Sequence, residues 1–340
     1  MGVRAFLTGI SGLTLTPKER AFLREVRPWG GILFKRNIDK PDQVSGLISE
    51  FRRELDSPEA PILIDQEGGR VQRLAPPHWP AYPAGATFGA LYDEDARAGL
   101  RAAWLGARLI AADLVALGIT VDCLPLADVP VAGADAVIGD RAYGTTPDKV
   151  AAIARAVADG LAAGGVLPVV KHIPGHGRAT ADSHHRLPVV ETPAAELERS
   201  DFAAFRPLAD LPMAMTAHVV FSAIDPAQPA TTSATMIQQV IRNGIGFQGL
   251  LMSDDVSMNA LSGSIAARSR AAIAAGCDVV LHCNGKLDEM RAVADAVPEL
   301  AGAALLRAER ALATRRAPQP FNALAGRAEL DRLIAGGRLA

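Results

Sequence analysis

The segment VLPVVKHIPGHG, residues 166–177, contains the pattern on which the fold prediction rests. It begins with an unbroken apolar run that ends on two ionisable residues, Lys171 and His172. A continuously apolar run of this length is typical of a parallel strand that is buried on both faces. A Gly-rich loop follows, so the predicted strand ends where its polar side chains begin.

The same arrangement is repeated along the chain, because apolar runs alternate with long helical segments rich in Ala, Leu and Arg. The predicted strands are 3–9, 30–34, 61–65, 119–129, 166–172, 212–219, 249–255 and 278–283. Repeated βα units without a linker predict an α/β fold, a single (β/α)8 TIM-type barrel over residues 1–315 in which the first strands can be irregular. Residues 316–340 are expected to form a C-terminal helical tail packed on the barrel. A doubly wound open sheet is the alternative.

Start signals for helices support these units. Thr-Pro pairs at 16–17, 146–147 and 192–193 mark predicted helix starts, because Thr caps a helix and Pro suits its first position. In the first of them, Glu19 completes a capping box. The helix that begins after the second is expected to end near Gly164-Gly165.

The composition is that of an ordinary globular protein, with 49% hydrophobic and 21% charged residues in a chain of 340. A net charge of −2 predicts neither a nucleic-acid partner nor a membrane partner. The three cysteines form no CxxC pair, and the N-terminus lacks a clear signal-peptide core. We therefore expect reduced thiols and a cytoplasmic location.

Ionisable residues stand directly after several of the predicted strands. In a barrel the C-terminal ends of the strands converge on one face, so side chains at those ends predict the functional site. A solvated rim alone would not require charged groups at so many strand ends. The polar residues at these five strand ends are Asp65, Lys171-His172, His218, Asp254-Asp255 and His282-Cys283-Asn284.

Asp254 is the candidate nucleophile. It follows the apolar run GLLMS directly, so its carboxylate is expected at the barrel mouth on a rigid strand. The alternative for this pair of carboxylates is that one caps the next turn or pairs with an arginine, and for Asp255 we favour that alternative.

Asp182-Ser183-His184 is a candidate acid/base pair. In an extended segment residues two apart point the same way, so Asp182 can hold His184 in one tautomer. An imidazole titrates near neutral pH and can both donate and accept a proton. The alternative is a surface hydrogen bond.

Asp65 and Arg73 flank the turn at Gly68-Gly69. Glycines allow the backbone to approach a ligand closely, and charged groups on either side can bind vicinal hydroxyls. Arg141 lies in another polar loop, after the fourth predicted strand. A structural ion pair is the alternative role for Arg141.

The histidines also raise the alternative of a metal site. A zinc or iron set could be drawn from His172, His176, Asp182, His184 and His218. Pro174 and Gly175 argue against it, since no helix can place His172 and His176 on one face. We predict no metal and no organic cofactor, because no dinucleotide fingerprint follows a predicted strand.

Four segments occur in an order that resembles glycoside hydrolase family 3. They are ILFKRNI (32–38), IDQEGGRVQR (64–73), the DSH loop (182–184) that KHIPGHG opens, and MSDDVSM (252–258). More specifically, they resemble the compact single-barrel β-N-acetylglucosaminidases of bacterial cell-wall recycling. The resemblance covers the first strand to about residue 290.

The resemblance implies a role for each matching residue. Asp254 is the nucleophile, His184 the general acid/base and Asp182 its partner. Substrate binding falls on Asp65, Arg73, Arg141, Lys171 and His172. The implied substrate is a muropeptide that contains N-acetylglucosamine, and the expected state is a monomer or small homo-oligomer. A β-glucosidase or β-xylosidase of the same family, a metal-dependent barrel hydrolase and a non-catalytic sugar-binding protein remain alternatives.

Overall fold

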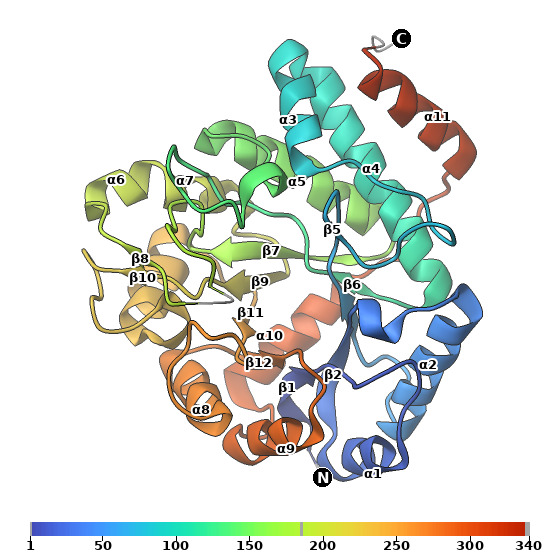
Figure 1. Cartoon of the computed structure of the whole chain (residues 1–340), viewed down its shortest axis with the longest axis vertical. Coiled ribbons are helices and arrows are strands. Elements are labelled where there is room, and N and C mark those ends of the chain that lie inside the picture. Colours follow the sequence, from blue (N-terminus) through green and yellow to red (C-terminus); the bar gives the residue numbers. More distant parts are fainter. Residues whose placement is uncertain (1, 184–185, 337–340) are drawn as a thin grey trace.

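The computed structural model describes residues 2–183 and 186–336, and it contains a closed parallel barrel surrounded by helices (Figure 1). The eight barrel strands are hydrogen-bonded in the order β1-β12-β11-β9-β7-β6-β3-β2. The predicted (β/α)8 barrel is therefore confirmed, and the open-sheet alternative is wrong. The pairing of β1 with β2 shifts register between Arg4 and Leu7, so the barrel is irregular at its first strands.

Each barrel strand overlaps one of the predicted apolar runs. Their bounds are Arg4–Thr8 (β1), Pro28–Leu33 (β2), Ile62–Ile64 (β3), Val121–Asp122 (β6), Leu167–Ile173 (β7), Met213–Thr216 (β9), Leu250–Asp255 (β11) and Val279–His282 (β12). Two small sheets, which the sequence pattern did not predict, lie outside the barrel. They pair Gln66–Gly68 (β4) with Val71–Gln72 (β5), and Val189–Val190 (β8) with Val220–Phe221 (β10).

Helices cover the barrel on its outer side (Figure 1). Those before β9 are Pro17–Val26 (α1), Pro41–Glu54 (α2), Gly85–Glu94 (α3), Ala96–Leu117 (α4), Pro147–Ala163 (α5), Ala194–Arg199 (α6) and Asp201–Phe205 (α7). Those after it are a π-helical segment Met236–Ile245, then Ile265–Ala275 (α8), Leu287–Ala296 (α9), Gly302–Ala313 (α10) and Ala323–Ile334 (α11).

The predicted helix starts differ in how well they match. At α1, the Thr16 side chain accepts from the Glu19 backbone N–H, and the Glu19 carboxylate accepts from the Thr16 backbone N–H, so the capping box is present. α5 begins at Pro147 and ends at Ala163 before Gly164, as expected, although Thr146 makes no capping bond. The third prediction is off by one residue, since α6 begins at Ala194 and Pro193 is its N-cap.

The fourth strand is much shorter than predicted. β6 contains only Val121–Asp122, whereas the apolar run extends to residue 129. The Leu124 N–H turns back to the Asp122 carbonyl, and Pro125 has no N–H to donate to a ladder. Beyond the turn the chain still lies beside β7, where the Ala127 N–H donates to the Lys171 carbonyl over 2.7 Å. This bend carries the next residues toward the barrel mouth.

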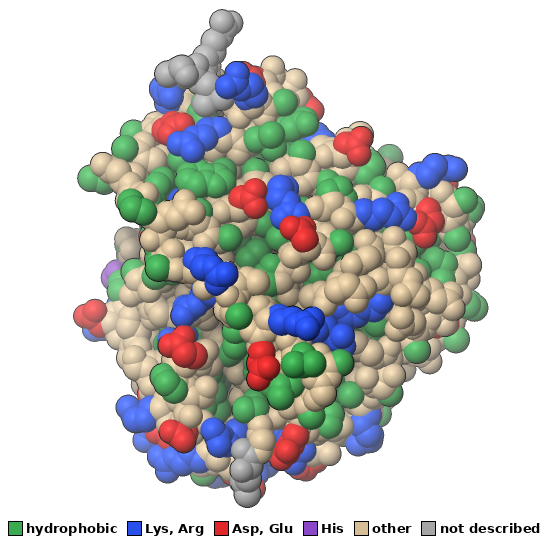
Figure 2. All heavy atoms as spheres, turned by 180° about the vertical axis from the view of Figure 1, so that it is seen from behind, with side chains coloured by type: hydrophobic (Ala, Val, Ile, Leu, Met, Phe, Trp, Pro, Cys, Tyr) green, Lys and Arg blue, Asp and Glu red, His purple; other side chains and the backbone are tan. Residues whose placement is uncertain are grey.

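The segment after α10 returns to the body of the molecule. α11 lies beside α3 and α4 (Figure 1) and buries Leu330 and Leu333 completely. Charges of both signs are mixed over the face in Figure 2, as expected for a net charge near zero. Within residues 2–183 and 186–336, no helix is long and apolar enough to cross a bilayer.

Candidate active site

A cavity of about 300 Å³ lies at the C-terminal ends of the barrel strands. Every predicted site residue that the structure describes lines it, namely Asp65, Arg73, Arg141, Lys171, His172, Asp182 and Asp254. The remaining predicted residue, His184, lies outside the described residues. Residues from segments more than a hundred positions apart therefore meet at one place.

The hairpin of β4 and β5 places Asp65 and Arg73 side by side. Gly68 and Gly69 have φ angles of +91° and +54°, a region that favours glycine. The buried Gln66 side chain holds the hairpin closed, because its Oε1 accepts from the Arg73 and Leu74 backbone N–H groups over 2.9 Å. Across the turn, Arg73 Nη2 lies 2.9 Å from Asp65 Oδ2.

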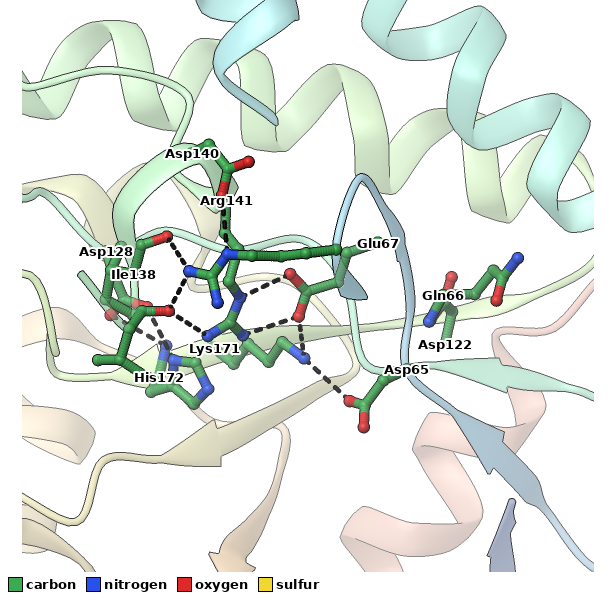
Figure 3. Close-up of polar contacts among 12 residues, drawn as sticks. Asp65, Gln66, Glu67, Asp122, Asp128, Ile138, Asp140, Arg141, Lys171 and His172 are labelled. Carbon is green, nitrogen blue, oxygen red and sulfur yellow. Dashed lines mark hydrogen bonds and ion pairs between the residues drawn. The ribbon is translucent and has the colours of Figure 1, made fainter. Parts of the chain in front are cut away.

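Lys171 and Arg141 are tied together by a carboxylate that the sequence analysis did not single out. Figure 3 shows Glu67 between them, with Lys171 Nζ 2.7 Å from Glu67 Oε1. Arg141 binds both oxygens of Glu67, at 2.8 and 2.9 Å. Lys171 Nζ also lies 3.0 Å from Asp65 Oδ1. Arg141 thus forms the structural ion pair considered for it and lines the cavity as well.

The network keeps its charges although it is buried. Burial alone would raise the pKa of the Glu67 carboxyl, but Lys171 and Arg141 lower it to about 2. Burial opposes ionisation of Asp65 in the same way, and Lys171 and Arg73 hold its pKa far below the ordinary value. The pKa of Lys171 is raised, because the two carboxylates outweigh its burial. The site therefore presents fixed charges at neutral pH.

His172 is oriented by Asp128, which is completely buried. Asp128 Oδ2 lies 2.7 Å from His172 Nδ1, and its Oδ1 accepts from the backbone N–H groups of His172 and His176. Burial would raise the pKa of Asp128, but His172 lowers it, so the carboxylate only accepts. Nδ1 of His172 consequently carries the proton, and Nε2 is the ring atom left for a ligand.

Asp254 and Asp255 at the end of β11 have different surroundings. The Asp255 N–H donates to Asp254 Oδ1 over 2.8 Å. The Asp255 carboxylate accepts from Ser257 N, Ser257 Oγ and Cys283 N, at 2.9, 2.6 and 3.1 Å. Asp255 therefore caps the next turn, as we favoured, and both Asp254 and Asp255 contribute to the cavity wall.

The loop after β7 enters the cavity at Asp182 and Ser183. His176 Nε2 lies 3.1 Å from Ser183 Oγ, and the Ala260 N–H donates to the Ser183 carbonyl over 3.1 Å. Burial lowers the pKa of His176 to about 4, so its imidazole is neutral at pH 7. His176 thus supports the loop that leads to His184.

Glu67 and Asp128 are the site residues that sequence reasoning missed. Glu67 stands two positions after Asp65, so an extended segment turns both carboxylates to one side. Asp128 stands one residue before the end of the fourth apolar run, close to where other ionisable residues end theirs. The rule used for the other strand ends would have found it. Among the residues that the structure describes, no group of His, Cys, Asp and Glu is arranged to hold a metal ion.

A closed barrel with carboxylates and fixed cations around a polar cavity at its C-terminal mouth is the arrangement of a barrel glycoside hydrolase. A comparison with known protein families gives a more specific classification. The model of the glycosyl hydrolase family 3 N-terminal domain matches residues 16–311, and the chain belongs to this family.

Known relatives are similar over most of their length. A beta-hexosaminidase from Methylococcus capsulatus is 39% identical over 325 residues, which cover 94% of this chain and 91% of that protein. One from Bordetella avium is 38% identical over 282 residues, 82% of this chain and 80% of that protein. The crystal structure of NagZ from Neisseria gonorrhoeae with N-trifluoroacetyl-D-glucosamine has a TM-score of 0.89 at 33% identity and covers 98% of this chain and 99% of that chain.

Proposed function

We propose that this glycoside hydrolase is a retaining β-N-acetylhexosaminidase that removes terminal, non-reducing β-linked N-acetylglucosamine through a covalent glycosyl–Asp254 intermediate. One observation carries the proposal: Asp254, Asp182 and the buried cation network line one cavity at the barrel mouth. The beta-hexosaminidase names of the relatives support the same reaction.

In the first step, an Asp254 oxygen attacks the anomeric carbon while the bond to the leaving oxygen breaks. His184 donates a proton to that oxygen, and Asp182 holds the imidazole in the required tautomer. In the second step, His184 takes a proton from water, the water oxygen attacks the anomeric carbon, and the Asp254 carboxylate is released.

The cations and carboxylates beside Asp254 bind the sugar. Asp65 accepts hydrogen bonds from hydroxyl groups, whereas Arg73, Arg141, Lys171 and His172 offer donors. Because the network around Glu67 is already ordered and charged, binding a sugar requires little reorganisation of these side chains. We further propose a muropeptide as the natural substrate, a cytoplasmic location and a monomer or small homo-oligomer.

Mass spectrometry after reaction with a fluorinated N-acetylglucosaminyl inactivator tests the nucleophile. We expect one adduct, on the peptide that contains Asp254, and no adduct in the Asp254→Asn variant. A stable adduct on any other carboxylate would overturn the assignment. Comparing nitrophenyl N-acetylglucosaminide with nitrophenyl glucoside and xyloside tests the sugar, and faster turnover of the latter two would contradict the proposal.

His184 is tested through the leaving group. The His184→Ala variant should lose least in the first step with good leaving groups, since these depart with little help from an acid. Equal losses for nitrophenyl and poorer leaving groups, measured as kcat/KM, would remove His184 from the role of acid.

A further inference from the structure

His218 is a buried histidine that no step of the proposed mechanism uses. It lies two residues beyond β9, and its side chain is completely buried. Both ring nitrogens have partners: Nδ1 lies 2.7 Å from Thr231 Oγ1, and Nε2 lies 3.0 Å from the Asp255 carbonyl oxygen. The side chain thus connects the end of β9 to the residue that follows the candidate nucleophile.

The direction of these hydrogen bonds follows from their partners. A carbonyl oxygen only accepts, so Nε2 carries a proton and donates to Asp255. Burial lowers the pKa of His218, so the ring is neutral at pH 7 and Nδ1 accepts from the Thr231 hydroxyl. The Thr231 hydroxyl donates its proton to His218 Nδ1, at 2.7 Å, in preference to the Ala217 carbonyl oxygen, at 3.1 Å. Thr216 Oγ1, 2.8 Å from Thr231 Oγ1, completes the chain as its donor.

The imidazole acts where the regular backbone pairing of β11 stops. β9 pairs with β11 only as far as Met215 and Met252, and the pairing of β11 with β12 shifts register between Met252 and Asp255. Beyond that point, His218 holds the Asp255 carbonyl from the β9 side. From the β12 side, the Cys283 N–H holds Asp255 Oδ1. β9, β11 and β12 are neighbours in the barrel (Figure 1).

We propose that His218 is a positioning residue for the nucleophile of this enzyme. Its bond to the Asp255 carbonyl sets the plane of the peptide that joins Asp255 to Val256 and fixes the residue whose N–H binds Asp254 Oδ1. One oxygen of the Asp254 carboxylate is thereby held in place, which aims the other at the anomeric carbon. The inference rests on the proposed role of Asp254.

Two substitutions of His218 separate this role from simple packing. In His218→Gln the amide nitrogen is at about the distance of Nε2 and can still donate to Asp255, whereas Asn is too short. We expect His218→Asn to lower kcat roughly a hundredfold, as small misplacements of reacting groups do. His218→Gln should recover about tenfold of that loss, because it restores the donor. The affinity for N-acetylglucosamine, measured by calorimetry, should stay unchanged in both.

A third variant and a control complete the design. Thr231→Val leaves Nδ1 without its donor and should cause a smaller loss of kcat, so the proposal can be tested even where His218→Asn does not fold. The acidic limb of the kcat/KM profile should move to higher pH in His218→Asn, because the ionised Asp254 loses a firmly held donor. His78→Gln changes an exposed histidine and should match the wild type.

Several results would overturn the inference. They are equal losses in His218→Gln and His218→Asn, an unchanged kcat in His218→Asn, or a loss of sugar affinity that parallels the loss of kcat. Failure of the proposed function looks different, because the wild-type enzyme would then form no adduct at Asp254. If the wild-type enzyme forms the adduct at Asp254 but the His218 variants keep the wild-type kcat, only the role of His218 is contradicted.

Discussion

The Glu67 carboxylate lies between Arg141 and Lys171, two cations that we propose bind the substrate. Its two oxygens are shared between Arg141 and Lys171, and its side chain is almost completely buried. A buried carboxylate that neutralises two neighbours is costly to remove, since Arg141 then loses its carboxylate partner and Lys171 keeps only Asp65. Much of the geometry of the cavity therefore depends on a residue that need not touch the sugar.

Replacing Glu67 by Gln keeps the shape of the side chain but removes its charge. We expect KM for nitrophenyl N-acetylglucosaminide to rise roughly tenfold, equivalent to about 1.4 kcal/mol of lost binding. The measurement is steady-state kinetics, with Glu59→Gln, which changes an exposed glutamate on the surface, as the matched control. An unchanged KM in Glu67→Gln would show that Arg141 and Lys171 keep their positions without it.

His176 makes a prediction about pH. Its pKa falls from 6.5 to about 4 on folding, mainly through burial, so the unfolded chain takes up this proton first as the pH falls. The contribution of His176 to stability should decrease as the pH falls from 6.5 to 4 and level off below 4, a loss of about 3 kcal/mol at about 1.4 kcal/mol per pKa unit.

Urea unfolding across this range measures that loss. The His176→Gln variant should lose about 3 kcal/mol less than the wild type between pH 6.5 and pH 4, because the other titratable groups contribute equally to both proteins. The exposed His78→Gln variant should keep the wild-type slope. Parallel curves for wild type and His176→Gln would contradict the expected shift.

At the scale of elements, the hairpin of β4 and β5 holds the neighbouring loop over residues 136–140. Arg70 at its tip donates to the carbonyls of Ala136, Val137 and Ile138 and to the carboxylate of Asp140. Val137 and Ile138 line the cavity, and Arg141 follows directly. One guanidinium therefore connects two loops that form the same wall of the site.

Arg70→Met should loosen this wall without touching the reacting atoms. We expect KM to rise roughly tenfold and kcat to stay within about twofold, in line with an effect on binding alone. Asp140→Ala should reproduce part of the change, because Asp140 anchors Arg70 from outside the cavity. The exposed Arg310→Met is the control. A fall in kcat at unchanged KM would assign Arg70 to the chemistry itself.

The elements themselves follow closely from local patterns. Each barrel strand overlaps an apolar run because burial on both faces favours apolar residues there. The prediction was less accurate where the chain departs from the ladder, as at β6, since Pro125 interrupts pairing inside a run that is mostly apolar. The short sheets of β4-β5 and β8-β10 were not predicted, because two or three paired residues leave no periodic signal.

At the scale of the whole molecule, α11 fastens the C-terminal segment to the barrel helices. Arg101 binds Glu329 through two hydrogen bonds of 2.8 Å, and Arg327 lies over the Tyr82 ring at 4.5 Å. Tyr82 belongs to the loop beside the β4-β5 hairpin, where its carbonyl accepts from the Gly69 N–H. We propose that α11 unfolds together with the barrel.

Two leucines of the C-terminal segment test this proposal. Leu330 is completely buried and Leu324 is 85% exposed. Leu330→Ala should lower the free energy of unfolding by about 2–5 kcal/mol, whereas Leu324→Ala should stay within about 0.5 kcal/mol of the wild type. Urea unfolding followed by circular dichroism should give one transition in each case. A separate early transition in Leu330→Ala would mean that α11 folds independently.

The amino-acid sequence alone was sufficient to predict the barrel, the approximate positions of its strands and seven of the residues that line its cavity. The reason is physical: apolar runs define buried parallel strands, and parallel strands in a barrel bring all their C-terminal ends to one face. Only the tertiary structure decided which side chains pair across that face. Glu67 shared by Arg141 and Lys171, Asp128 behind His172, and His218 against the Asp255 carbonyl join residues far apart in sequence. Such contacts require atoms to be positioned to within a few tenths of an ångström, and neither spacing nor periodicity along a chain encodes positions that accurately.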